Sequence, residues 1–176
     1  MADKIERSEI IETIKSTPFF ETLKADEEAL GEIADGLTIW HFEETAILVM
    51  EGDVGDSLYV IHKGSVRILK TTLAGEEYTV VTLSHNEHAC IGELSLFDTE
   101  RRSATVVAEV PTDVLIMKKE IFDKFADRYP RHALNIFRKL AGVMSTRLRK
   151  ANDDIITLFE ALVSEIEQDV VADETT

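Results

Sequence analysis

The sequence contains few of the residues that cross-link or stiffen a chain. Among its 176 residues are one cysteine, Cys90, three prolines and one tryptophan. A single cysteine excludes a disulfide within the chain and fits a reducing compartment, so we expect a cytoplasmic protein. The first residues, Met1 to Lys4, lack the apolar core of a signal peptide, which agrees with that expectation.

Long hydrophobic runs and an excess of positive charge are also missing. The longest apolar runs, such as Ala46 to Met50, are far shorter than the roughly 20 residues of a membrane-spanning helix, so we expect no membrane partner. The sequence has 19 basic and 34 acidic residues, which give a formal net charge of -15. Such a surface repels nucleic acid, so we expect no nucleic-acid partner either. A small anion can still bind where an arginine and backbone NH groups reverse the sign locally.

Hydrophobic periodicity changes twice along the chain. Residues 5–36 show helical spacing with a break at Pro18, because proline resists a helix interior. From Leu37 to Met117 the pattern becomes short β-branched runs, each followed by glycine, asparagine or acidic turn residues. Regular short strands without intervening helices predict an antiparallel barrel or jelly roll.

A long C-terminal helix is predicted from about Arg131. Its apolar positions alternate in steps of four and three over nearly three heptads. They are Met144, Leu148, Ala151, Ile155, Leu158 and Leu162. A helix of roughly 35 residues outruns a small barrel, so we expect a homodimer through this helix, although packing of the stripe on the barrel remains an alternative. We therefore expect two parts: residues 1–130 with the N-terminal helices and barrel, and residues 131–176 with the long helix and an acidic tail.

The most informative stretch joins Gly92, Glu93 and Leu94 to an arginine ten residues after the glycine, Arg102. Glycine lets the backbone approach an anion closely, and the NH groups that open the next short helix can receive it. Arg102 would add a bidentate positive group, and Glu93 can accept a hydrogen bond from a ribose hydroxyl. This combination suits a cyclic sugar phosphate. The plainer interpretations are an exposed loop arginine and an acidic helix cap.

Three segments in this order resemble the cyclic-nucleotide-binding domain family, which includes the sensor domains of catabolite activator protein and of the regulatory subunits of cyclic-AMP-dependent protein kinase. They read E-G-D-V-G-D-S at 51–57, G-E-L-S-L at 92–96 and R-S-A at 102–104. The resemblance covers roughly residues 15 to 150. It implies an eight-stranded jelly-roll-like β barrel with flanking helices, a mainly β fold, in which the last two segments form a phosphate-binding cassette.

The resemblance also implies a stand-alone sensor whose ligand is cyclic AMP or cyclic GMP, with no further cofactor. In the cassette, Ser103 and Ala104 would lend backbone NH groups to the phosphate, and a serine after the arginine accompanies either nucleotide in the family. On the long helix, Ala151 replaces a threonine that reads adenine in relatives, and Asn152 replaces a serine. Asn152 is therefore either a substitute contact to the base or an exposed helix residue. Because no DNA-binding module follows, the output would pass through an unknown effector protein or an altered dimer.

Catalytic and metal-binding patterns are weak. His85 and His88 form an H-x-x-H pair, but no third ligand follows at the spacing of a metal-binding cupin. We find no serine, cysteine or paired-carboxylate arrangement for catalysis, so we expect no metal site, no catalytic residue and no enzymatic activity. Two alternatives to a sensor stay open: a family member that lost its ligand and serves as a protein-interaction module, and a cupin-type small-molecule barrel enzyme.

Overall fold

The computed structural model describes residues 5–97 and 100–174, with side chains as far as residue 166. Two compact units are described separately, Met1–Ile136 and Phe137–Thr176. The helices are α1 (Arg7–Ser16), α2 (Glu27–Gly36), α3 (Lys119–Arg128) and α4 (Pro130–Glu174), with short 3-10 helices η1 (Pro18–Leu23), η2 (His85–Glu87) and η3 (Glu93–Leu96). The strands are β1 (Thr38–Phe42), β2 (Ile47–Val49), β3 (Ser57–Lys63), β4 (Ser65–Thr71), β5 (Glu77–Ser84), β6 (Cys90–Ile91), β7 (Thr105–Ala108) and β8 (Thr112–Lys118).

The helix boundaries follow local signals in the sequence. α1 ends at Ser16, and Pro18 opens the 3-10 helix η1, as the predicted break requires. α2 begins after Asp26, whose carboxylate accepts a hydrogen bond from the Ala29 backbone NH at 3.0 Å. α4 is longer than the sequence predicted, since it covers 45 residues.

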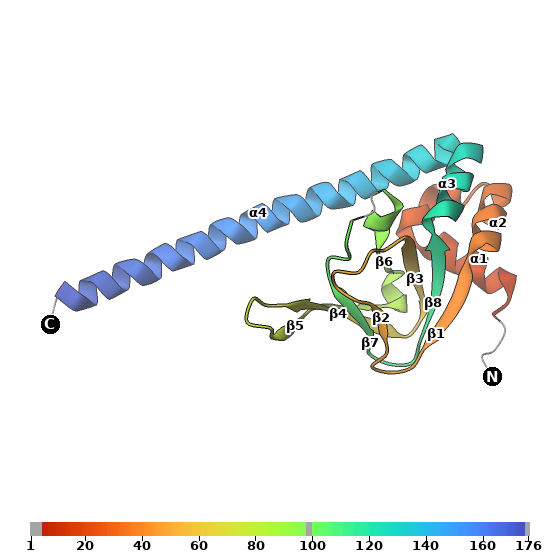
Figure 1. The fold of residues 1–176 in the computed structure, drawn as a ribbon. Helices are drawn as coiled ribbons and strands as arrows, with labels where there is room; N and C mark the ends of the chain where they lie inside the picture. Colours follow the sequence, from red (N-terminus) through yellow and green to blue (C-terminus); the bar gives the residue numbers. More distant parts are fainter. Residues whose placement is uncertain (1–4, 98–99, 175–176) are drawn as a thin grey trace. The chain divides into compact units, whose positions relative to one another are not determined.

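The strands form two antiparallel sheets, β1-β8-β3-β6 and β2-β7-β4-β5 (Figure 1). The predicted mainly β fold with flanking helices is therefore confirmed, but the predicted closed barrel is wrong. Among the described residues, no ladder joins the two four-stranded sheets. Edge strand β2 has three residues and edge strand β6 has two, so these edges offer too few backbone groups to close a barrel.

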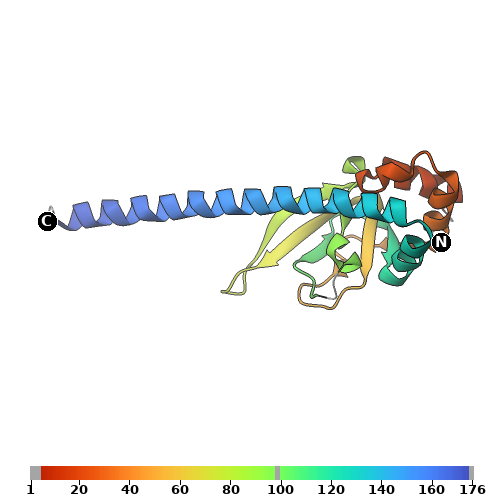
Figure 2. The ribbon, with the colours of Figure 1, turned by 90° about the horizontal axis from the view of Figure 1, so that it is seen from above.

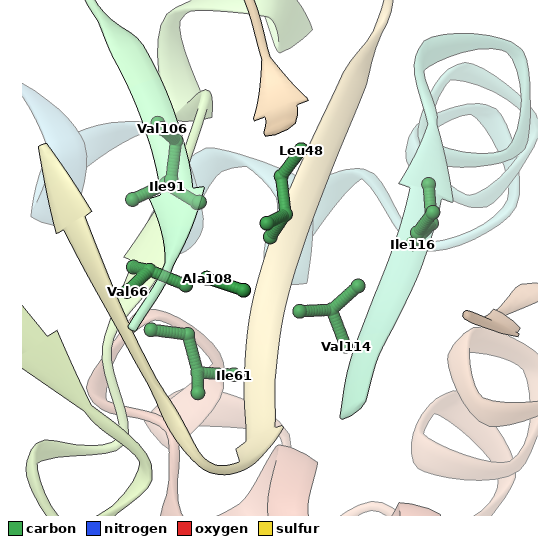
Figure 3. Packing of buried hydrophobic residues seen from close by; sticks show 8 residues of the cluster. All are labelled: Leu48, Ile61, Val66, Ile91, Val106, Ala108, Val114 and Ile116. Carbon is green, nitrogen blue, oxygen red and sulfur yellow. The ribbon is translucent and has the colours of Figure 1, made fainter. Parts of the chain in front are cut away.

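The core of the first unit lies between the two sheets. Figure 3 shows eight of its side chains: Leu48, Ile61, Val66, Ile91, Val106, Ala108, Val114 and Ile116. Each fully buried valine, leucine or isoleucine side chain contributes about 1.5–3 kcal/mol to the hydrophobic stabilisation. On β8 the alternate residues Leu115 and Met117 are also buried, and α3 contacts this strand.

The helices and the β4–β5 hairpin lie at opposite ends of the sheets. Figures 1 and 2 show α1, α2 and α3 gathered at one end, while the hairpin reaches out at the other. Most residues of β5 are exposed on both of its faces. The helical end of the unit is therefore the better packed one.

His62 on β3 holds α1 against the sheets. Its side chain is 8% exposed, and Nδ1 lies 2.7 Å from the Thr13 hydroxyl on α1. That hydroxyl donates its proton to the Glu9 carbonyl at 2.9 Å, so it accepts from the Nδ1–H of His62. Nε2 of His62 is buried and has no hydrogen-bond partner among the described residues. Burial lowers the pKa of His62, and the charge of Lys63 lowers it further, so the folded protein favours the neutral imidazole.

This depressed pKa predicts a loss of stability in acid. The contribution of neutral His62 is fully present above its unfolded pKa of about 6.5 and is lost as pH falls through the lower folded pKa. Denaturant titrations between about pH 7.5 and about pH 5 should show a falling free energy of unfolding, and His62→Gln should reduce the fall. His88→Gln, a change at an exposed histidine, is the control and should keep the wild-type profile. Identical pH profiles for wild type and His62→Gln would contradict this assignment.

Candidate ligand-binding site

Two of the three sequence motifs meet through backbone hydrogen bonds. The Arg102 NH donates to the Asp53 carbonyl at 2.7 Å, and the Gly52 NH donates to the Arg102 carbonyl at 2.9 Å. Arg101 adds a third bond, from its guanidinium to the Gly52 carbonyl at 2.6 Å. The turn at 52–53 therefore sets the position of Arg102, far along the chain.

The Arg102 guanidinium is half-buried and held by fixed contacts. One terminal nitrogen donates to the Ser95 hydroxyl at 2.7 Å, and the other donates to the Ser57 backbone carbonyl at 2.8 Å. The group also lies 5.5 Å from the ring centroid of Tyr59, within the range of a cation–π interaction. A guanidinium has five N–H donors, so these two bonds orient it and leave donors for an anion. The exposed-loop interpretation of Arg102 does not describe this arrangement.

Two glycines make room for the guanidinium. A Cβ atom at Gly55 or at Gly92 would overlap the Arg102 side chain. At Gly92 the Cβ would also lie 2.8 Å from the Ser57 carbonyl oxygen, and φ is +74°, which L side chains rarely adopt. Gly55 in the first motif and Gly92 in the second are therefore required by the arginine of the third.

Glu93 and Leu94 follow Gly92 in the single turn η3, with different exposures. Glu93 is buried at 7% exposure, whereas the Leu94 side chain is 40% exposed. The turn is closed by a hydrogen bond from the Ser95 NH to the Gly92 carbonyl at 3.1 Å. Burying a carboxylate costs free energy, and a residue that only caps a helix can remain exposed. The burial of Glu93 therefore does not fit the plain helix-cap interpretation. The structure thus brings Gly92, Glu93 and Arg102 into one place.

Ser103 and Ala104 occupy the bend between Arg102 and β7. The Ser103 side chain is exposed, and Ala104 is half-buried. Beyond the bend, the Thr105 hydroxyl accepts a hydrogen bond from the Glu51 NH at 3.0 Å. The backbone of the bend is therefore anchored on both sides.

Glu51 itself is fixed by an ion pair. Its carboxylate lies 2.7 Å from Nζ of Lys70 on β4. The hydrogen bond from Lys70 lowers the pKa of Glu51, so this carboxylate is charged at neutral pH. The pair joins the turn before Gly52 to the sheet.

Sequence reasoning missed the residues that orient the arginine. These are Gly55, Ser57, Tyr59 and Ser95. Three of them lie inside the quoted motifs, so a signal existed, but only the folded chain shows which groups face the guanidinium. Asn152 is exposed on α4 in the second unit, and its contact to a base stays a prediction.

The arrangement fits recognition of a small anion. It offers a half-buried guanidinium, the start of a short helix, and a bend of small residues, while the chain as a whole is strongly acidic. Across the described part of the chain, no three histidine, cysteine or acidic residues are grouped to hold a metal ion. No helix within those same ranges is long and apolar enough to cross a membrane.

Comparison of the sequence with known proteins identifies a family and several relatives. Residues 39–129 match the cyclic nucleotide-binding domain family. Cyclic AMP receptor protein of Thermus thermophilus is 37% identical over 102 residues, which are 58% of this chain and 44% of that protein. A cAMP-dependent protein kinase regulatory subunit of Mycosarcoma maydis is 33% identical over 146 residues, which are 80% of this chain and 25% of that protein. The chain thus spans less than half the length of either relative.

A solved structure shares the fold. The crystal structure of Thermus thermophilus catabolite activator protein superimposes with a TM-score of 0.69 at 30% sequence identity, over 81% of this chain and 63% of that one. The family match includes Gly92, Glu93 and Arg102, the residues that the structure brings together. The chain belongs to the cyclic nucleotide-binding domain family.

Proposed function

We propose that this chain is a regulatory domain that senses cyclic AMP or cyclic GMP at the site around Arg102. One observation carries the proposal: the half-buried guanidinium is oriented by Ser57 and Ser95 and retains further donors. Gly55 and Gly92 leave the space that the guanidinium occupies free of side-chain atoms of their own. Such a pre-oriented fork binds a phosphate without first losing side-chain freedom.

The remaining contacts follow from the chemistry of a cyclic nucleotide. Its cyclic phosphate carries one negative charge, which Arg102 neutralises while the backbone NH groups of Ser103 and Ala104 donate to the phosphate oxygens. Glu93 accepts a hydrogen bond from the ribose hydroxyl, and Leu94 contributes apolar contact beside it. Ser103 suits either purine, so both nucleotides belong to the proposal.

In this proposal the domain is a sensor and not an enzyme. A ligand shifts a protein between two conformations only by binding one of them more tightly. The guanidinium of Arg102 contacts Ser57 and Ser95, which lie on two separate chain segments, so a phosphate on this group acts on both together. An effector protein or a second copy of the chain then reads the change.

We further propose that the chain forms a homodimer through α4. The predicted seam is uncovered in the second unit: Leu148, Ile155, Leu158 and Leu162 are each between 53% and 70% exposed. A contiguous apolar stripe of this kind marks an interaction surface. A helix from a second copy would bury it by heptad packing.

Ligand binding predicts a rise in thermal stability. Cyclic AMP or cyclic GMP at about one hundred times its dissociation constant should add about 2.7 kcal/mol, which raises the melting temperature by about 5 to 11 °C. Arg102→Ala should abolish the rise, and Glu93→Ala should reduce it. Arg131→Ala is the matched control, because this arginine is exposed at the start of α4 and lies in none of the three motifs, and it should retain the rise. Differential scanning fluorimetry measures all four proteins.

A negative result also has a defined meaning. If millimolar nucleotide does not shift the wild type, and mass spectrometry finds no copurified nucleotide, the sensor proposal fails. The interaction module without ligand would then replace it.

The close contact between Gly55 and Arg102 predicts that a side chain at position 55 lowers both stability and nucleotide affinity. In Gly55→Ala the new Cβ displaces the Arg102 guanidinium, so its two hydrogen bonds weaken and stability falls by about 1–3 kcal/mol. Nucleotide affinity should fall about tenfold or more, since the charge moves. Gly142→Ala is the control: it has open space on α4 and should stabilise by about 0.5–1 kcal/mol. Unchanged affinity in Gly55→Ala, measured by calorimetry, would refute this role.

Self-association predicts a dependence on the distal part of α4. The full chain should sediment as a dimer at micromolar concentration, whereas a chain ending at Lys150 should be largely monomeric, because most of the seam is removed. Circular dichroism checks that the shortened chain keeps its β structure. A full-length monomer at high micromolar concentration would end the dimer proposal.

A further inference from the structure

A cavity of the first unit is formed by α1, the end of β3 and η2. Its volume is about 410 Å³, which is within the range of small-molecule sites. Glu9 lines it from α1, His62 from β3 and His85 from η2. The cavity is separate from the arginine site, because Ser57 is five residues from His62 on β3, or about 16 Å along an extended strand.

His62 carries an unused hydrogen-bond acceptor at this cavity. Its side chain is 8% exposed, and Nδ1 donates its proton to the Thr13 hydroxyl at 2.7 Å. Nε2 is therefore the nitrogen with the lone pair, and it is buried without a hydrogen-bond partner among the residues that the structure describes. Burial lowers the pKa of His62, so Nε2 stays unprotonated at neutral pH. An unpaired buried acceptor costs free energy, which a donor on a ligand would recover.

Two further groups at the cavity also accept hydrogen bonds. A carboxylate oxygen of Glu9 lies 4.0 Å from Nε2 of His62, too far for a direct hydrogen bond. Nδ1 of His85 donates to a backbone carbonyl at 3.0 Å, so the other nitrogen of its neutral ring is an acceptor. Glu12 lines the cavity as well, but its carboxylate is paired with Lys15 at 2.9 Å. A ligand that complements these groups supplies donors and positive charge.

We propose that this cavity binds a primary ammonium group, carried by a small amine or by a lysine side chain of another protein. An ammonium nitrogen about 2.9 Å from each acceptor fits between Nε2 of His62 and the Glu9 oxygen, with one N–H directed at each. The Glu9 carboxylate balances its charge. Ile61 also lines the cavity and offers apolar contact to the alkyl chain. The Glu9 side chain is 53% exposed, so it can rotate to admit the ligand.

Other ions match the cavity less well. A planar guanidinium fork suits the two oxygens of one carboxylate, whereas the three rotatable donors of an ammonium reach acceptors on different residues. Within the described ranges, 5–97 and 100–174, no three histidine, cysteine or acidic residues are grouped to hold a metal ion. An anion would meet the carboxylates of Glu9 and Glu12. The donor pattern and the charge therefore point to an ammonium group.

Titration of the full chain with pentylammonium tests the recognition. Two probes are ligand controls: pentanol has the same alkyl chain without the charge, and tetramethylammonium has the charge without an N–H donor. Pentylammonium should bind at least about tenfold more tightly than either, because only it forms charge-assisted hydrogen bonds. Equal binding of the three probes, or no binding at about 10 mM pentylammonium, would overturn the inference.

Variants near the start of α1 locate the site. Glu9→Gln should weaken pentylammonium binding about tenfold, because a neutral amide does not balance the ammonium charge. Glu6→Gln is the matched control, since it removes the same charge from an exposed side chain outside the cavity. It should keep the affinity within about twofold. Unchanged affinity in Glu9→Gln would refute the assignment.

Nitrogen NMR of the histidine rings gives a direct readout at the buried acceptor. Pentylammonium should shift the Nε2 resonance of His62, because this nitrogen gains a hydrogen bond. The ring of His41, which pairs with Asp113 and lies outside the cavity, should keep its resonances. In His62→Gln, binding should be lost while circular dichroism shows an intact fold. An unchanged Nε2 resonance at saturating pentylammonium would place the ligand elsewhere and contradict the proposal.

A peptide titration distinguishes the two sources of the ammonium group. A short peptide with one internal lysine is compared with the same peptide acetylated on that lysine, which has lost the charge. Tighter binding of the lysine peptide than of pentylammonium would assign the cavity to another protein, and weaker binding would assign it to a small amine. Nucleotide binding is measured separately by the thermal shift. Failure of either proposal therefore leaves the other standing.

Discussion

The position of one guanidinium connects the three segments that carry the candidate site. Arg102 contacts the carbonyl of Ser57 and the hydroxyl of Ser95, and its backbone pairs with the turn at 52–53. A side chain at position 55 or 92 would not fit beside it, since a Cβ added to Gly55 or Gly92 would overlap the guanidinium. A change in any of these segments therefore changes the direction in which the charge points. This dependence is what a binding site for a small anion requires, because the donors are oriented before the ligand arrives.

Strand β3 relates this site to the helical end of the first unit. It begins at Ser57, passes Tyr59 beneath the guanidinium, and ends near His62, which holds Thr13 of α1. The strand is paired on both sides, with β8 and with β6, and its apolar residues are buried. A well-packed strand moves as a unit more readily than it deforms. The arginine site and the contact that holds α1 therefore share one rigid element.

Charge is distributed unevenly in this strongly acidic protein. The net charge of -15 disfavours polyanions over the surface as a whole. Arg102 is half-buried, however, and partial desolvation there strengthens the attraction between its guanidinium and a single small anion. On α4 the sign changes within a few residues, between Lys150 and Asp153. Net charge thus describes long-range repulsion, while local arrangement decides what a given surface binds.

Local patterns in the sequence were sufficient for much of this protein. Apolar spacing predicted the helices and most strands, and proline predicted the break after α1. The spacing of Gly92, Glu93 and Arg102 suggested a phosphate site, and the structure brings these residues together, while binding of a phosphate stays a prediction. These features depend on neighbours within a few residues, which is why a linear reading finds them. The predicted barrel closure failed because closure depends on the lengths of edge strands that are far apart in sequence. β6, with two residues, was too short to be recognised at all.

Only the tertiary structure decided which groups orient Arg102. The Ser57 carbonyl is 45 positions away in sequence, and a backbone carbonyl has no signature in the identity of its residue. His62 and Thr13, which are in contact through their side chains, are likewise far apart in sequence, by 49 positions. The sequence by itself determined which residue types the candidate site contains and the order in which they occur. Folding decided their distances and burial, since these arise from strand pairing and core packing between distant segments.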